Sequence, residues 1–190
     1  MEDGLQASEH RKEQMTQRKK VIIIISVVAT LVALYFLLPV LLVVFVAQPV
    51  RVEGAAMSPT LNNGDRIFIS KRVDPLQRGD IVVFYYPKDT TKSFIKRVVG
   101  LPGERIDIDS EGNVMINGQA LKESYVQPER NQTAKARWNS VPAEWKQLGE
   151  DSYFILGDNR DASNDSRSYG PVSKKLIYGK YLMRYWSSSQ

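Results

Sequence analysis

Val52-Glu-Gly-Ala-Ala56-Met-Ser58-Pro-Thr-Leu61 is the stretch at which this chain of 190 residues changes character. Before it lies the only long apolar run of the sequence. After it come short segments rich in β-branched and aromatic residues, separated by Gly, Pro, Asn and Asp. The first pattern is typical of a membrane-spanning helix and the second of an all-β domain. The sequence therefore predicts one anchor followed by one domain.

The anchor is predicted at residues 21–47, which carry no charge and exceed the roughly 20 residues that cross a hydrocarbon core. Residues 1–20 are polar and highly charged, and we expect a disordered or fraying cytoplasmic tail. Their basic end, Arg18-Lys19-Lys20, predicts an N-terminus in the cytoplasm and residues 48–190 outside. A cleaved secretory signal ending at Phe45-Val-Ala47 is disfavoured, because its apolar region usually has only about 7 to 15 residues.

The composition excludes several kinds of catalytic site. The chain has no cysteine, so disulfides, thiolate nucleophiles and cysteine-ligated zinc are absent. Its single histidine, His10, lies in the charged tail, which removes a Ser-His-Asp triad and any multi-histidine metal site. Acid-base chemistry would therefore depend on lysine or carboxylates, and no metal or organic cofactor is implied.

The region after the anchor predicts a mainly β domain. Its apolar runs and turn signals predict strands and one hairpin. We expect residues 103–150 to form an insertion or satellite region, in which 122–150 contain long loops or a short helix. The expected strands are 50–53, 66–70, 81–86 (central), 93–99, 153–156 and 179–186, and the hairpin pairs 106–108 with 114–116.

Lys96 is the first candidate for chemistry. Period-two alternation places Phe94, Lys96 and Val98 on one face of a strand and Arg97 on the other. An apolar pocket lowers the pKa of a lysine from about 10.4, and a neutral amine can act as general base toward a serine hydroxyl. The alternative is that both cations reach solvent at the ends or edges of the sheet.

Three separated blocks, in chain order, resemble the type I signal peptidases. They are Met57 to Leu61, Phe94-Ile-Lys-Arg-Val-Val-Gly-Leu-Pro-Gly103 and Leu156-Gly-Asp-Asn-Arg-Asp-Ala-Ser-Asn-Asp-Ser-Arg167. With the anchor, the resemblance covers nearly the whole chain. It implies a coiled β-sheet domain outside the membrane, with Lys96 as general base. It also implies that Ser163 steadies this lysine and that an Asp165–Arg167 pair holds the last loop in shape.

The nucleophile position departs from this family. Its motif, G-x-S-M-x-P-T-L, places the attacking serine at position 56, where this chain has Ala56. Ser58 is two residues away, which in an extended segment is roughly 6 to 7 Å, whereas proton transfer needs about 3 Å. The Ala56 backbone N–H would still form part of an oxyanion hole, but Gly54 lacks the second, side-chain donor of some members. A Ser-to-Ala substitution explains the other retained site residues more simply than a naturally inactive paralogue.

The resemblance implies a membrane-bound serine endopeptidase that removes N-terminal signal peptides from exported preproteins by a Ser/Lys dyad. An extended segment over residues 50–56 and the strand around 93–96 would form a groove in which the substrate adds as a β-strand. Val52, Gly54, Phe94 and Ile95 are the expected substrate-binding residues. Small residues such as Ala are then expected before the cut. The implied partners are signal peptides, the lipid bilayer and the secretion translocase, and the implied location is the bacterial cell membrane with a single span.

Other functions are less consistent with the sequence. A self-cleaving Ser-Lys regulator would carry a DNA-binding module, whereas this N-terminus offers 20 polar residues and an apolar helix, so no nucleic acid is expected. A calcium loop starting at Asp158 would need Glu where Tyr169 stands. An inert, membrane-tethered preprotein-binding homologue remains the alternative, because Ala56 would produce one.

Overall fold

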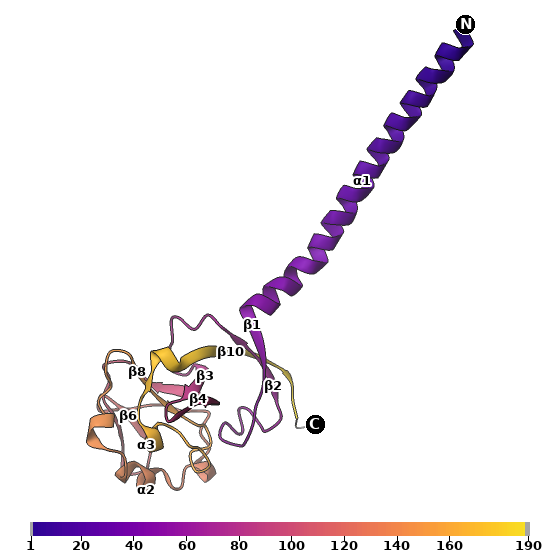
Figure 1. Ribbon diagram of the computed structural model, residues 1–190. Helices are drawn as coiled ribbons and strands as arrows, with labels where there is room; N and C mark the ends of the chain where they lie inside the picture. The colour runs from indigo at the N-terminus through magenta and orange to yellow at the C-terminus, as the bar shows by residue number, and fades with distance from the viewer. Residues whose placement is uncertain (1, 189–190) are drawn as a thin grey trace. The chain divides into compact units, whose positions relative to one another are not determined.

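The computed structural model describes residues 2–188, which divide into two units after Phe45 (Figure 1). The first unit is a single helix, α1 (Glu2–Val46), in which Gln17–Val40 is long and apolar enough to cross a membrane. Ser26 Oγ donates to the Ile23 carbonyl at 3.0 Å and Thr30 Oγ1 to the Ser26 carbonyl at 2.8 Å. These hydroxyl groups are therefore satisfied within the helix, as an apolar surrounding requires.

The helix begins at Glu2, so the expectation of a disordered tail over residues 1–20 is wrong for the residues that the structure describes. Glu, Gln, Lys and Arg dominate this tail, and their helix propensities are close to that of Ala. Once the apolar segment has formed a helix, extending it costs no new nucleation. Charge alone therefore does not end the helix at residue 20.

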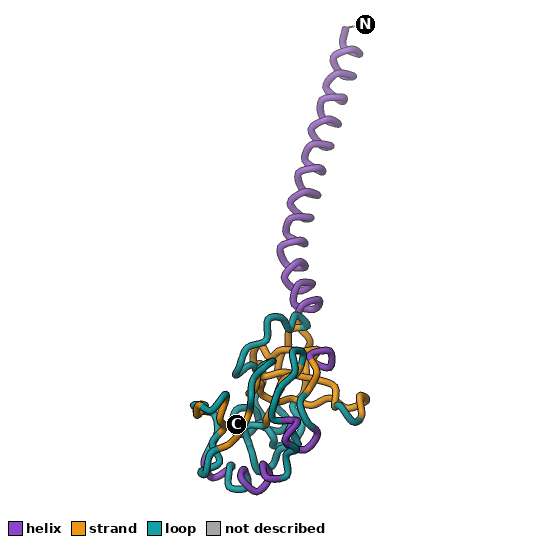
Figure 2. Tube along the Cα trace, turned by 90° about the vertical axis from the view of Figure 1, so that its left-hand side faces the viewer, coloured by secondary structure: helices purple, strands orange, loops and turns teal. Residues whose placement is uncertain are grey.

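The second unit is built on a seven-stranded sheet in the order β1-β2-β10-β3-β4-β8-β9, with every neighbouring pair antiparallel. The mainly β fold with an N-terminal apolar helix is thus confirmed, and β3 is central as predicted. Figure 2 shows the strands in orange among many loops. The strands are β1 (Ala47–Arg51), β2 (Arg66–Ser70), β3 (Ile81–Tyr86), β4 (Asp89–Gly100), β8 (Ser152–Leu156), β9 (Val172–Ser173) and β10 (Ile177–Trp186).

A smaller three-stranded sheet and short helices fill the region between β4 and β8. The predicted hairpin is present, and Asn117 and Gly118 turn the chain into a third strand with φ of 50° and 81°, which suits an Asn-Gly turn. The elements are β5 (Ile106–Ile108), β6 (Val114–Ile116), β7 (Gln119–Ala120), α2 (Ala134–Asn139) and the 3₁₀ turns Pro128–Arg130 and Ala143–Trp145. Beyond β8 follow α3 (Ser166–Tyr169) and the 3₁₀ turn Lys174–Leu176.

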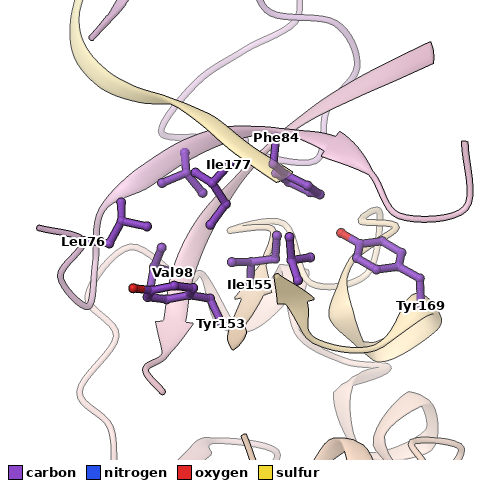
Figure 3. Packing of buried hydrophobic residues seen from close by; sticks show 9 residues of the cluster. Leu76, Phe84, Val98, Tyr153, Ile155, Tyr169 and Ile177 are labelled. Carbon is purple, nitrogen blue, oxygen red and sulfur yellow. The ribbon is translucent and has the colours of Figure 1, made fainter. Parts of the chain in front are cut away.

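Strand β4 separates two of the buried clusters. Val98 packs with Phe84, Ile155 and Tyr169 in the cluster drawn in Figure 3. Val99, one residue on, packs in a second cluster that joins the small sheet and α2 to the large sheet. Because successive side chains of a strand point to opposite faces, the preceding residues of β4 also face different surroundings.

Candidate active site

A pocket of about 160 Å³ lies between the quoted stretch and β4. The structure brings the predicted substrate-binding residues together here, beside the positions predicted for the nucleophile and the general base. A segment that precedes β2 and a strand that follows β3 thus face each other across one cavity. Its lining residues are Val50, Arg51, Val52, Glu53, Gly54, Ala56, Met57, Val83, Ser93, Phe94, Ile95, Lys96 and Tyr178.

Lys96 is buried, with 5% of its surface exposed, so it does not reach solvent at the sheet edge. Its Nζ donates to the Ile95 carbonyl at 2.9 Å and lies 5.2 Å from the centre of the Phe94 ring. Burial lowers the pKa of Lys96 from 10.5 to about 8, although the carboxylates of Asp165 and Asp158 act in the opposite sense. A measurable fraction of this amine is therefore neutral near pH 7.

The segment around Ala56 is a series of turns rather than the expected extended strand, because β1 ends at Arg51. The Ala56 carbonyl accepts a hydrogen bond from the Asn159 N–H at 3.0 Å, which ties this turn to the last block. Ser58 is buried, and its Oγ donates to Asn62 Oδ1 at 2.9 Å. The Ser58 hydroxyl is thus held within the turn and does not line the pocket.

Asp158 connects all three blocks of the sequence. Its carboxylate accepts from Arg97 Nε at 2.8 Å and Nη2 at 2.6 Å, and from Thr60 Oγ1 at 2.5 Å. The Arg97 guanidinium also donates to the Gly79 carbonyl and lies 4.0 Å from the Tyr125 ring. Burial alone would lower the pKa of Arg97, but the hydrogen bond and charge of Asp158 outweigh it and raise that pKa.

Asp165 and Arg167 form the pair that the sequence predicted. Arg167 Nε and Nη2 donate to the two carboxylate oxygens at 2.8 and 2.7 Å, and both residues are buried. Burial raises the pKa of Asp165, but the hydrogen bonds and charge of Arg167 outweigh it, so the pKa is lowered. Asp165 also caps α3 by accepting from the Arg167 N–H, and it accepts from the Gly157 N–H at 3.2 Å. The carboxylate therefore fixes both ends of its loop.

Ser163 lies against Gly157, and 4% of the Ser163 surface is exposed. Its Oγ lies near enough to Asp165 to favour that carboxylate, yet it makes no hydrogen bond of acceptable geometry within residues 2–188. A Cβ atom on Gly157 would lie 2.2 Å from Ser163 Oγ and 2.5 Å from the Ala56 carbonyl oxygen. Only glycine at position 157 allows the Ser163 side chain and the backbone of residue 56 to approach so closely.

The arrangement combines a lysine of lowered pKa, a pocket of about 160 Å³ and a backbone turn at residue 56. It can accept a proton from a group placed at position 56, but alanine supplies none. Within the part of the chain that the structure describes, no three His, Cys, Asp or Glu side chains lie together as a metal site would require.

Several residues at this site were missed or underestimated from the sequence. The sequence around Asp158 only argues against a calcium loop, and it does not predict the bonds of Asp158 to Thr60 and Arg97. The signal was present in the alternation of β4, because a cation opposite Lys96 needs its own counter-charge. Tyr178 lines the pocket from β10, whose place beside β3 no local pattern indicates.

Comparisons with known proteins agree with the three blocks. Residues 21–186 match the family described as signal peptidase, peptidase S26. The chain is 38% identical over 155 residues to a signal peptidase I of Leptolyngbya laminosa, which covers 75% of this chain and 70% of the relative. It is 35% identical over 165 residues to a probable signal peptidase I-1 of Synechocystis sp., covering 80% and 78%. A crystal structure of a signal peptidase I from Enterococcus faecalis aligns with a TM-score of 0.46 and 32% identity, over 56% of this chain and 96% of that one.

Proposed function

The chain belongs to the signal peptidase family, peptidase S26, and from this we propose that it has the site of a membrane-bound serine endopeptidase that removes N-terminal signal peptides from exported preproteins. One observation carries the proposal. Ala56 and Lys96 line the same pocket, and burial lowers the pKa of Lys96 to about 8. A base of this pKa matches acid-base chemistry near neutral pH without a histidine.

In the proposed mechanism, a hydroxyl at position 56 attacks the scissile carbonyl while Lys96 Nζ accepts its proton. The negative charge that forms on the carbonyl oxygen is stabilised by the residue 56 N–H, which alanine retains. The intermediate then expels the amine of the mature protein, which takes the proton from the Lys96 ammonium. Lys96 next deprotonates a water molecule, whose attack on the acyl-enzyme releases the signal peptide and restores the hydroxyl.

In the supporting roles, we assign Ser163 to steady the Lys96 amine and the Asp165–Arg167 pair to hold the loop that carries Ser163. Val52, Gly54, Phe94 and Ile95 contact the substrate, which lies extended between the residue 50–57 segment and β4. The small volume of the pocket favours small side chains, such as Ala, before the cut.

Ala56 favours a second candidate function for this sequence, that of a membrane-tethered protein that binds preproteins without cleaving them. Loss of the attacking oxygen costs on the order of a million-fold in turnover in other serine hydrolases. The groove and the residue 56 N–H do not depend on that oxygen, so we expect substrate binding to persist.

The proposed location is the bacterial cell membrane. Residues 21–47 would span it once, residues 1–20 would lie in the cytoplasm and residues 48–190 outside. The basic residues before the apolar run favour this orientation. The partners are the bilayer and the signal peptides of preproteins, whose apolar segments lie in the same membrane, and the secretion translocase that delivers them.

The test is Ala56→Ser in the full-length chain, incubated in lipid vesicles with a preprotein that has an Ala-x-Ala site. We expect cleavage to rise by about a million-fold over the present chain and to be lost again in Ala56→Ser/Lys96→Ala. Below pH 8 the rate should fall about tenfold per pH unit as Lys96 becomes protonated.

Two outcomes would decide against this assignment. If Ala56→Ser folds and binds the preprotein but does not cleave it, the binding function is the better description. If Ser58→Ala abolishes an activity of the present chain, the nucleophile has been placed at the wrong residue.

A further inference from the structure

The loop that carries Ser163 is hydrogen-bonded to α2 and to the segment that precedes α2. Asp161 accepts hydrogen bonds from the Gln132 N–H at 3.0 Å, the Thr133 N–H at 2.8 Å and Thr133 Oγ1 at 2.6 Å. In return, the Asp161 N–H donates to the Arg130 carbonyl at 3.1 Å. Thr133 is the N-cap of α2 but makes no side-chain cap bond of its own. The catalytic loop and this helix are thus joined at the start of α2.

A second connection comes from Arg137, in the middle of α2. Its Nη1 donates to the Arg160 carbonyl at 2.8 Å, and its Nη2 donates to the Ser163 carbonyl at 2.7 Å. The planar guanidinium group therefore spans the loop and fixes the backbone of Ser163 itself. Burial is the main cause that lowers the pKa of Arg137, and the positive charge of Arg167 lowers it further. The surroundings of Arg137 therefore disfavour its charged form.

The helix that carries Arg137 is anchored by the next residue, Trp138. This side chain is 3% exposed, packs edge-on against Phe154 of β8 and donates from Nε1 to Asp107 Oδ1 at 2.9 Å. The backbone of α2 is thereby anchored to the large sheet and to β5. Arg137 projects from a fixed point, which is what positioning a loop to a few tenths of an ångström requires.

We propose that Arg137 is a positioning residue, through which the region between β4 and β8 fixes Ser163 for its action on Lys96. Within residues 2–188, the buried Ser163 hydroxyl lies near Asp165 but makes no hydrogen bond of acceptable geometry. Its place is therefore set largely by the backbone that Arg137 holds on one side and by Gly157 on the other. This inference rests on the proposed function. It adds that residues 103–150 take part in catalysis through the loop rather than only covering the sheet.

The experiment is a double-mutant cycle in the active Ala56→Ser chain. Arg137→Met should lower kcat by roughly 10- to 100-fold with little change in KM, because a small displacement of a catalytic group is costly. In the Ser163→Ala background the same change should lower kcat less than about threefold, since the hydroxyl that the Arg137 bond positions is already gone. Lys135→Met, on the exposed side of the same helix, is the matched control and should leave both constants unchanged.

Equal losses from Arg137→Met with and without the Ser163 hydroxyl would show a purely structural role and overturn the inference. Where Arg137→Met unfolds at the assay temperature, Arg137→Lys carries the same cycle, because its ammonium keeps the charge but cannot reach both carbonyls. Absence of cleavage by Ala56→Ser overturns the proposed function and this inference together. Cleavage with additive losses overturns this inference alone.

Discussion

Lys96 and Arg97 are adjacent on β4, yet on the two faces of that strand the pKa values of their side chains shift in opposite directions. On the pocket face, Lys96 Nζ donates to the Ile95 carbonyl, and burial lowers the pKa of this amine. On the other face, Arg97 donates hydrogen bonds to both carboxylate oxygens of Asp158, and the pKa of Arg97 is raised. The difference shows that charge state at this site depends on whether a counter-ion is within hydrogen-bond distance, and not on burial alone.

The same loop supplies both environments. Asp158 stands directly against Arg97, whereas Asp165, the carboxylate on the Lys96 side, is already engaged by Arg167. Asp165 therefore influences Lys96 through space without a hydrogen bond to it. A lysine surrounded in this way keeps a neutral form available, while the arginine beside it stays charged and fixes the strand to the loop.

Exchanging the two cation types should give the largest effect on this contrast. In Ala56→Ser, Lys96→Arg should lower kcat/KM by about 10⁴-fold, because a guanidinium does not deprotonate in proteins and cannot act as the base. Arg97→Lys should cost about tenfold or less, since one charge–charge contact remains. The measurement is kcat/KM for preprotein cleavage at pH 8. Comparable losses in the two variants would remove the distinction between the faces.

Removing the counter-ion should give the next largest effect. Asp158→Asn leaves Arg97 charged and buried, and we expect a loss of about 3 kcal/mol in the free energy of unfolding, measured with urea. Because the Asp158 charge opposes the lowering of the Lys96 pKa, the pH midpoint for cleavage by Ala56→Ser should also move down. Asp89→Asn, which breaks an exposed pair with Lys92, is the control and should change neither quantity. An upward midpoint would contradict the assignment.

Replacing Lys96 by an apolar residue should change stability by about as much, with opposite sign. The pKa of Lys96 is about 8 in the folded chain and 10.5 in the ordinary state, so below pH 8 the chain folds at the cost of a buried charge. Lys96→Met should then increase the free energy of unfolding by about 3 kcal/mol at pH 6 to 7. The gain should shrink as the pH rises from 8 to 10.5 and vanish above it. Urea unfolding at several pH values measures this, and a gain independent of pH would exclude the lowered pKa.

The strands and the placement of Lys96 among apolar neighbours could be predicted from the sequence because their signals are local. The alternation around Lys96, the turn at Asn117-Gly118 and the apolar run of β3 each depend on a few consecutive residues. The turn around Ala56 was wrongly expected to be extended, because its geometry is set by Asn159 and by packing under β2. Those contacts come from distant parts of the chain and leave no local pattern.

The roles of Arg137 and Tyr178 were out of reach for the same reason. Arg137 lies on a six-residue helix of weak pattern, and its partners are backbone carbonyls, which any sequence provides. Tyr178 depends on β10 pairing between β2 and β3, far from its sequence neighbours. The sequence thus indicates which side chains can carry chemistry, whereas it does not indicate the order of the strands in the sheet.

The hydrogen bond between Thr60 and Asp158 joins residues 98 positions apart, and that between Arg97 and Asp158 spans 61. Contacts of such separation form late in folding, because the loop they close is long. During synthesis, Lys96 would therefore acquire its buried environment only after the chain has been completed to Arg167.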